Sequence, residues 1–220
     1  MALYGVYGAG GCGRGILPIV RDQLETGDRL VFVDDKAGAA VNGHQVLSLA
    51  DFLASEASEK RICIAVANGE TRLKLAAQCG VAGLEFFSVH HDNCIKMDDI
   101  EIGEGALFSP FTTVTSNVRI GDHFHCNLYS FVEHDCVIGD FVTFAPAVRC
   151  NGNVTIGDGA YIGAGAVIRQ GLSIGVGATI GMGAVVTKNV PAGETWVGNP
   201  AAPISAKLGQ TLPQSHRRFF

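Results

Sequence analysis

The chain of 220 residues lacks a long apolar run, a signal-peptide pattern and any metal-binding spacing of cysteine and histidine. A transmembrane helix needs roughly 18 to 20 apolar residues in a row, and no stretch approaches that length. We therefore expect a soluble, cytoplasmic protein without a membrane partner. The seven cysteines are scattered singly, with no C-x-x-C pair, which predicts small buried thiols in a reducing compartment. A formal net charge of −5 argues against nucleic acid as a partner.

The chain does contain a six-residue repeat that runs from Ile102 to Val186. Fifteen consecutive apolar residues fill every sixth position: Ile102, Phe108, Val114, Ile120, Cys126, Val132, Ile138, Phe144, Cys150, Ile156, Ile162, Ile168, Ile174, Ile180 and Val186. Ile-Gly pairs recur every eighteen residues from Ile102 to Ile174. This spacing predicts a three-sided parallel β-helix with one hexad on each side and about 4.8 Å between coils.

The first ninety residues show no such repeat and read as a small α/β unit. A strand from Ala2 to Tyr7 leads into a glycine-rich turn, and a helix is expected from Ile16 to Leu24. Strand, glycine turn and helix is the order in which backbone N–H groups hold a phosphate. Further strands end at Asp34-Asp35, where a carboxylate can meet a ribose or a base, and at Asn68. We therefore predict a Rossmann-like nucleotide-binding domain, which at about ninety residues is too small for the two-half sheet that binds NAD.

The predicted boundaries give three parts: a Rossmann-like domain at residues 1–93, a β-helix at 94–206 and a tail at 207–220 with no assigned role. Residues 89–93 are polar and turn-forming, and we expect them to form a linker with His90 and His91 at the surface or in a hinge.

One column of the predicted coil carries candidate chemistry, because residues eighteen apart stack along the axis. His134 lies two residues after the inward Val132, so it should point outward near a corner, next to Glu133 and Asp135. A neutral imidazole held by a carboxylate is the usual general base near pH 7. Gly152, one coil further on, would leave the space beside the ring empty. Lys188, three coils on, could meet a phosphate of a long ligand.

Other polar columns have structural interpretations. We interpret the acidic residues that follow Ile-Gly pairs as solvated corner residues and not as a metal ladder; they are Glu104, Asp122, Asp140 and Asp158. Asn117, Asn153 and Asn189 share the column of Asp135, and asparagine tolerates a left-handed corner. His123 and His125 flank Phe124, and we expect packing or a subunit interface there.

Several segments resemble a known family. The stretches 132–139, 150–157 and 196–201, with the glycine turn and Asp34-Asp35 in front, are similar to the left-handed β-helix acetyltransferases. Within these, the chain resembles the sialic-acid O-acetyltransferase-like enzymes, and most of all the N-acetyltransferases of nucleotide-linked 4-amino-4,6-dideoxysugars, of which the perosamine N-acetyltransferases are one group.

The resemblance implies a left-handed β-helix and a homotrimer with active sites between the β-helices of neighbouring subunits. It also implies that acetyl-CoA lies along the coils. It implies that His134 is the base, Asp135 its orienting partner, and that Gly152, Ala164 and Met182 contact acetyl-CoA through their backbones. It also implies that the N-terminal domain holds the nucleotide sugar, for which the candidate residues are Gly8, Gly10, Gly11, Cys12, Gly13, Arg14, Asp34, Asp35 and Asn68. Relatives commonly have histidine where this chain has Cys12.

The expected function is therefore acetyl-CoA-dependent N-acetylation of a nucleotide-linked amino sugar without a metal. Three alternatives remain open: O-acetylation of a sugar hydroxyl, a zinc enzyme of the γ-carbonic-anhydrase type, and a non-catalytic trimeric nucleotide-binding scaffold. A zinc site needs three converging histidines, and the coil offers only His123, His125 and His134 without a His-x₄-His pair. The sequence identifies neither the base nor the stereochemistry of the sugar.

Overall fold

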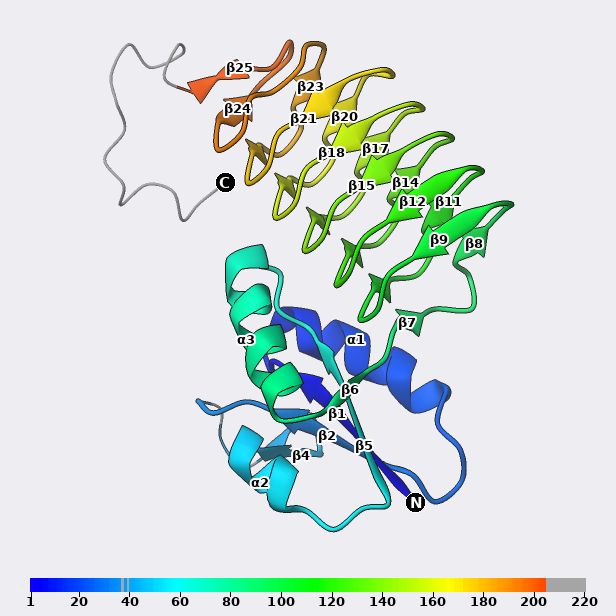
Figure 1. Cartoon of the computed structure of the whole chain (residues 1–220), viewed down its shortest axis with the longest axis vertical. Helices are drawn as coiled ribbons and strands as arrows, with labels where there is room; N and C mark the ends of the chain where they lie inside the picture. Colours follow the sequence, from blue (N-terminus) through cyan, green and yellow to red (C-terminus); the bar gives the residue numbers. More distant parts are fainter. Residues whose placement is uncertain (37, 39, 205–220) are drawn as a thin grey trace.

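The computed structural model describes residues 1–36, 38 and 40–204, so the predicted tail at 207–220 lies outside the described residues. The chain forms two parts that Figure 1 shows one above the other, a small α/β domain and a long three-sided coil. No helix in the described part of the chain combines the length and apolar character that a bilayer crossing requires.

The N-terminal part is a six-stranded sheet in the order β3-β4-β2-β1-β5-β6. Its pairs are parallel except for the β3–β4 hairpin. The strands are β1 (Ala2–Tyr7), β2 (Arg29–Val33), β3 (Ala40–Val41), β4 (His44–Leu47), β5 (Glu59–Ile64) and β6 (Glu85–Phe86). The helices are α1 (Gly11–Asp22), α2 (Leu49–Ala54) and α3 (Gly69–Val81). In Figure 1, α1 lies between the sheet and the coil, whereas α3 lies along the other face of the sheet with its first residues toward the coil.

Helix α1 begins five residues before the predicted start at Ile16, because its first turn is built from glycines that carry no apolar pattern. The turn is tight: a Cβ on Gly13 would lie 1.7 Å from the carbonyl oxygen of Gly8. Gly8 itself has a φ of 107°, a conformation that only glycine adopts readily. These two glycines let the helix start directly against the end of β1.

The coil consists of three parallel sheets, which we call sheets I, II and III. Sheet I contains β7 (Val89–His90), β10 (Leu107–Phe108), β13 (His125–Cys126), β16 (Thr143–Phe144), β19 (Tyr161–Ile162), β22 (Thr179–Ile180) and β24 (Thr195–Val197), with β25 (Ala202–Pro203) antiparallel at its edge. Sheet II contains β8 (Ile95–Lys96), β11 (Thr113–Val114), β14 (Phe131–Val132), β17 (Arg149–Cys150), β20 (Val167–Ile168) and β23 (Val185–Val186). Sheet III contains β9 (Ile100–Ile102), β12 (Val118–Ile120), β15 (Val137–Ile138), β18 (Thr155–Ile156) and β21 (Ser173–Ile174).

The register confirms the eighteen-residue coil. His125 pairs with Thr143, and Phe131 pairs with Arg149, each eighteen residues on. Fourteen of the fifteen predicted inward residues are buried, and Ile102 is partly buried against the same core. The corners have the expected left-handed backbone at Asn117, Asp135 and Asn153, with φ values of 58°, 60° and 56°. The expectation was wrong for Asn189, which does not have a positive φ and whose side chain accepts the N–H of Ser173 at 3.0 Å.

The coil starts within the segment that we predicted as a linker. Val89 is fully buried in β7, which pairs with β10, and β8 follows, so two strands of the first coil precede the repeat that the sequence revealed. In that first coil the inward positions are His90 and Lys96, which are polar. The His90 ring stacks on Phe108 at 5.0 Å, and the Lys96 ammonium lies 5.7 Å from the same ring. These residues cap the open end of the core, as terminal repeats of stacked proteins do, and so interrupt the apolar pattern.

Candidate active site

The corner between sheets II and III carries the predicted base. His134 follows β14 and is exposed, as is Asp135. The Nδ1–H of His134 donates to Oδ2 of Asp135 at 2.7 Å, and the amide of Asn117, one coil below, donates to Oδ1 of Asp135 at 3.1 Å. The left-handed backbone of Asp135 turns its carboxylate back toward the preceding side chain. The structure thus brings the predicted pair into direct contact.

This contact determines the protonation chemistry of the pair. The hydrogen bond that His134 donates to Asp135 raises the pKa of His134 above its ordinary value. The same bond and the one donated by Asn117 lower the pKa of Asp135. Because Nδ1 donates to the carboxylate, Nε2 is the ring nitrogen left to accept a proton.

Gly152 lies directly over the free side of the ring. A Cβ at this position would come within 2.5 Å of both Cε1 and Nε2 of His134. The predicted empty space beside the imidazole is therefore a steric requirement for this ring position. Within the described residues the N–H of Gly152 makes no hydrogen bond.

The remaining coil residues that were predicted to contact acetyl-CoA lie at two different corners. Lys188 follows β23, so it shares the corner between sheets II and III with His134 and Gly152. Ala164 and Met182 follow β19 and β22, which places them at the corner between sheets I and II. Both are exposed, but one chain does not bring them beside His134.

The glycine turn lies at the carboxyl end of β1, as predicted. Asp34 accepts the N–H of Ala9 at 3.0 Å and that of Lys36 at 3.0 Å. Asp35 accepts the Tyr7 hydroxyl at 2.9 Å and the N–H of Leu49 at 3.0 Å. Both carboxylates thus already shape the loop itself, which the sequence did not indicate.

Arg14 and Asn68 also make contacts within the protein. Nη1 of Arg14 donates to the carbonyl of Ala9 at 3.1 Å, which holds this exposed guanidinium beside the glycine turn. The side chain of Asn68 accepts the N–H of Thr71 at 2.8 Å and so caps α3. The cap explains this asparagine without a ligand.

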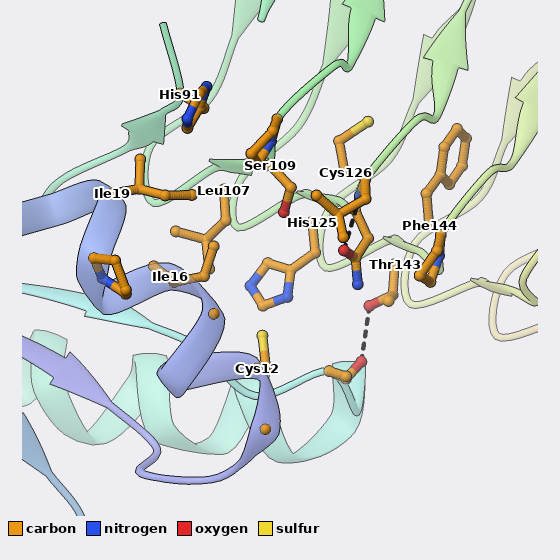
Figure 2. Close-up of a pocket in the computed structure, with 18 of the residues that line it drawn as sticks. Cys12, Ile16, Ile19, His91, Leu107, Ser109, His125, Cys126, Thr143 and Phe144 are labelled. Carbon is orange, nitrogen blue, oxygen red and sulfur yellow. Dashed lines mark hydrogen bonds between the residues drawn. The ribbon is translucent and has the colours of Figure 1, made fainter. Parts of the chain in front are cut away.

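A cavity of about 630 Å³ lies between α1 and the coil. Gly11, Cys12 and Ile16 line it from α1, and His125, Asn127 and Thr143 line it from the coil. Figure 2 shows Cys12 pointing across the cavity toward the His125 ring. Burial raises the pKa of the Cys12 thiol, which keeps it protonated near neutral pH. His134 is not among the described residues that line this cavity.

His125 and His123 pack between the two parts of the chain, in line with the packing role that we expected. His125 is buried and its Nε2–H donates to the carbonyl of Ile64 at 2.9 Å. Burial, with the nearby Arg72, lowers the pKa of His125 well below its ordinary value, so the ring is neutral. His123 stacks on Phe141 at 5.0 Å and meets the edge of Phe86 at 4.7 Å.

The aspartate carboxylates of the acidic column accept hydrogen bonds from the backbone of the preceding coil, and together these bonds form a ladder. Asp122 accepts the N–H of Glu104 at 3.0 Å, Asp140 that of Asp122 at 2.8 Å, and Asp158 that of Asp140 at 3.0 Å. The glycine before each turn leaves room for the carboxylate. Across residues 1–36, 38 and 40–204, no three or more His, Cys, Asp or Glu side chains gather as a metal site would require.

Sequence reasoning missed Arg72, a fully buried residue of α3 that contacts both parts of the chain. A signal was present: Arg72 shares a helical stripe with Ala76 and Cys79, which are the other buried residues of α3. A charged residue on the buried stripe of a helix requires hydrogen-bond partners.

Comparisons with known proteins agree with this geometry. The family model of the PglD N-terminal domain matches residues 5–79, and that of the hexapeptide repeat of succinyl-transferase matches residues 153–188. The chain is 51% identical over 211 residues to the GDP-perosamine N-acetyltransferase of Escherichia coli O157:H7, covering 91% of this chain and 96% of that protein.

Two solved structures extend the similarity to the whole fold. WeeI from Acinetobacter baumannii AYE superposes with a TM-score of 0.90 at 49% identity, covering 93% of this chain and all 100% of that one. PerB from Caulobacter crescentus in complex with CoA and GDP-perosamine superposes with a TM-score of 0.84 at 25% identity, covering 91% and 96% of the two chains. The chain therefore belongs to the family of hexapeptide-repeat sugar N-acetyltransferases that carry a PglD N-terminal domain.

Proposed function

We propose that this protein transfers the acetyl group of acetyl-CoA to the 4-amino group of a nucleotide-linked 4-amino-4,6-dideoxysugar, GDP-perosamine or a UDP-linked equivalent. The observation that carries the proposal is the pair His134–Asp135 with the space over Nε2 kept open by Gly152. Of the relatives named above, the Escherichia coli O157:H7 protein is a GDP-perosamine N-acetyltransferase, and PerB was solved with CoA and GDP-perosamine.

In the proposed mechanism, Nε2 of His134 takes a proton from the sugar amine as the amine attacks the thioester carbonyl. Asp135 holds the ring through Nδ1–H and stabilises the imidazolium that forms. The new C–N bond replaces the C–S bond, and the proton on His134 passes to the leaving thiolate of CoA. No covalent enzyme intermediate is required, since the amine is itself the nucleophile.

Gly152 has a second role in this mechanism. Its N–H makes no hydrogen bond within the described residues and would donate to the carbonyl oxygen of the thioester as that oxygen develops negative charge. One such donor typically contributes about 3 kcal/mol to transition-state stabilisation. Lys188, at the same corner and three coils on, would meet a phosphate of CoA.

The acceptor would bind at the other part of the chain. The glycine turn, from Gly8 to Gly13, would hold the diphosphate at the N-terminus of α1, with Arg14 adding a positive charge. The cavity beside Gly11 and Cys12 then offers a largely apolar space for the deoxysugar. The nucleotide would also contact the side chains of Asp34, Asp35 and Asn68. The carboxylates of Asp34 and Asp35 have lone pairs, and Asn68 has an amide NH₂ group, that their bonds within the protein do not use.

A homotrimer would complete this site. His134 lies at one corner of the β-helix, whereas Ala164, Met182 and the cavity lie at or beside another corner. The β-helix of a neighbouring subunit is therefore needed to bring His134 together with these residues. At the second corner the rings of Phe111 and Tyr129 stack at 5.1 Å while 52% and 62% exposed, as expected for an uncovered subunit contact. Light scattering that gives a monomer would contradict the trimer.

The cysteines favour a reducing compartment, and we place the protein in the cytoplasm. All seven are free thiols, including five that are fully buried or nearly so.

The test is an acetyl-transfer assay with a thiol reagent that detects released CoA. GDP-perosamine, UDP-linked 4-amino-4,6-dideoxysugars and free sialic acid are compared as acceptors. We expect turnover with a nucleotide-linked amino sugar; transfer to sialic acid alone would favour O-acetylation. His134→Asn should lower kcat roughly 10²- to 10⁴-fold with little change in KM. Calorimetry with CoA is the control, since that variant should retain CoA binding; a variant with near-normal kcat would refute the assignment of the base.

A further inference from the structure

The junction between the two parts of the chain contains a buried guanidinium without a carboxylate. The side chain of Arg72 is fully buried, and no described aspartate or glutamate forms an ion pair with it. Burial lowers the pKa of Arg72 to about 10, so it is still charged at neutral pH. Such a charge is expensive to bury and persists only where hydrogen bonds replace its water.

All three nitrogens of Arg72 donate to neighbouring oxygens. On the side of the nucleotide-binding domain, Nη1 donates to the carbonyls of Val66 at 2.7 Å and Ala67 at 3.2 Å. On the side of the coil, Nε donates to the carbonyl of His123 at 2.9 Å, and Nη2 donates to the carbonyl of Phe141 at 2.7 Å and to Oγ1 of Thr143 at 3.0 Å. One planar group thus joins the loop after β5 to two successive coils.

The loop that Arg72 holds lies directly behind the glycine turn. The N–H of Ala65 donates to the carbonyl of Tyr7 at 2.8 Å, and a Cβ on Gly8 would lie 2.9 Å from the carbonyl oxygen of Ala65. Oγ1 of Thr143 also donates to the carbonyl of Ala67 at 2.8 Å, the bond that is dashed in Figure 2. Displacement of this loop would therefore displace the glycine turn.

The contact between Arg72 and His125 also holds the two parts of the chain in one orientation. Nη1 of Arg72 lies 3.5 Å from Nδ1 of His125, whose Nε2–H donates to Ile64. Because Arg72 has no acceptor, Nδ1 must face it unprotonated, which fixes the tautomer of this cavity residue. Directional bonds of this kind fix an orientation, whereas apolar side chains in the same space would let the surfaces slide.

We propose that Arg72 is a positioning residue for acetyl transfer: it fixes the nucleotide-binding domain on the coil and thereby places the acceptor amine relative to the base and the thioester. This inference rests on the proposed function. In the proposed function one part of the chain holds the nucleotide and the other holds CoA. A change at the junction should therefore lower the rate of transfer without changing the affinity for either ligand. A displacement of about 1 Å between reacting groups can lower a rate about 10²-fold without changing either affinity.

The test uses Arg72→Lys, which retains the charge but loses the planar fork, in the full-length protein. We expect kcat with the nucleotide amino sugar to fall about 10- to 100-fold, normalised to sites titrated with GDP by calorimetry. The dissociation constants of GDP and CoA should stay within about twofold of those of the original protein. Lys74→Met, an exposed change on the same helix, is the matched control and should leave kcat unchanged.

A second variant keeps the test decisive if Arg72→Lys fails to fold. Thr143→Val has the same shape and removes both the acceptor for Arg72 and the donor to Ala67, so kcat should fall about 3- to 10-fold with both affinities retained. If these variants melt at a lower temperature but turn over normally per GDP site, Arg72 is structural and the inference is wrong. If the original protein acetylates no nucleotide amino sugar, the proposed function is wrong and the inference falls with it.

Discussion

Gly152→Ala is the change that tests the chemistry of the coil most directly. The added methyl would lie 2.5 Å from Cε1 and Nε2 of His134 and 3.0 Å from Cδ2. Ordinary contacts between such atoms are about 3.5 to 4.0 Å, so the ring has to move by about 1 Å or more. The imidazole is on the surface, with 59% of its side chain exposed, and it can swing outward into water.

The fold should tolerate this change while the reaction does not. Gly152 does not have a positive φ, so alanine fits its backbone, and a stability difference of more than about 1 kcal/mol is not expected. The displaced ring cannot keep its 2.7 Å bond to Asp135. Loss of this bond and a shift of about 1 Å together predict a fall in kcat of roughly 10²-fold.

The pH dependence of kcat/KM provides a second readout. The base must be neutral, so activity is lost as the pH falls through the pKa of His134. Asp135 raises that pKa, and Gly152→Ala breaks their contact, so the acid limb should move to lower pH. Gly80→Ala, at an exposed glycine of α3 with open space for a Cβ, is the control for a glycine-to-alanine change. A Gly152→Ala enzyme with kcat within threefold of normal and an unmoved acid limb would refute the placement of the base.

Two further predictions follow from the same corner and from the acidic ladder. Asp135→Asn keeps a residue that accepts the left-handed corner but removes the carboxylate, so the acid limb should move to lower pH and kcat should fall roughly 10²-fold in the CoA-release assay; an unchanged acid limb would mean that Asp135 does not control the ring. Asp122→Ala removes the acceptor of the Glu104 N–H, so the urea midpoint should fall by the equivalent of about 1 kcal/mol with kcat unchanged. A change in kcat above threefold for Asp122→Ala would implicate the ladder in the reaction.

The coil could be predicted from sequence because its period turns separation along the chain into distance in space. Once eighteen residues make a coil, the neighbours of every side chain are known, which is why the proximity of Gly152 to His134 was visible before any coordinates. The spacing placed His134 between two carboxylates, Glu133 and Asp135, and the family resemblance indicated Asp135 as the partner that the ring contacts.

The period fails where the coil ends. His90 and Lys96 occupy inward positions, but a terminal coil faces water, so its inward side chains are polar and the start of the coil at Val89 was hidden. The start of α1 at Gly11 was missed for a related reason, since glycines chosen for close approach carry no helical pattern.

The contacts of the N-terminal domain could not be predicted, because no repeat relates them to the coil. The sequence singled out Asp34 and Asp35 as ligand residues, but which way each carboxylate turns depends on Tyr7 and Leu49, residues brought near only by the fold. In the same way, the partners of Arg72 are carbonyl oxygens from five separate residues, which no side-chain motif can indicate.

These two kinds of structure divide the proposed active site into a part fixed by the coil and a part fixed by the junction. The coil holds His134, Asp135 and Gly152 through its backbone hydrogen bonds, so we expect their relative positions to vary little in any sequence that keeps the repeat. The orientation of the N-terminal domain has no such regular set of bonds and depends on a few junction bonds, those of Arg72 and Thr143 above all. If the N-terminal domain holds the acceptor as proposed, substitutions in this domain and at its junction would change acceptor preference while the acetyl-transfer chemistry of the coil stays the same.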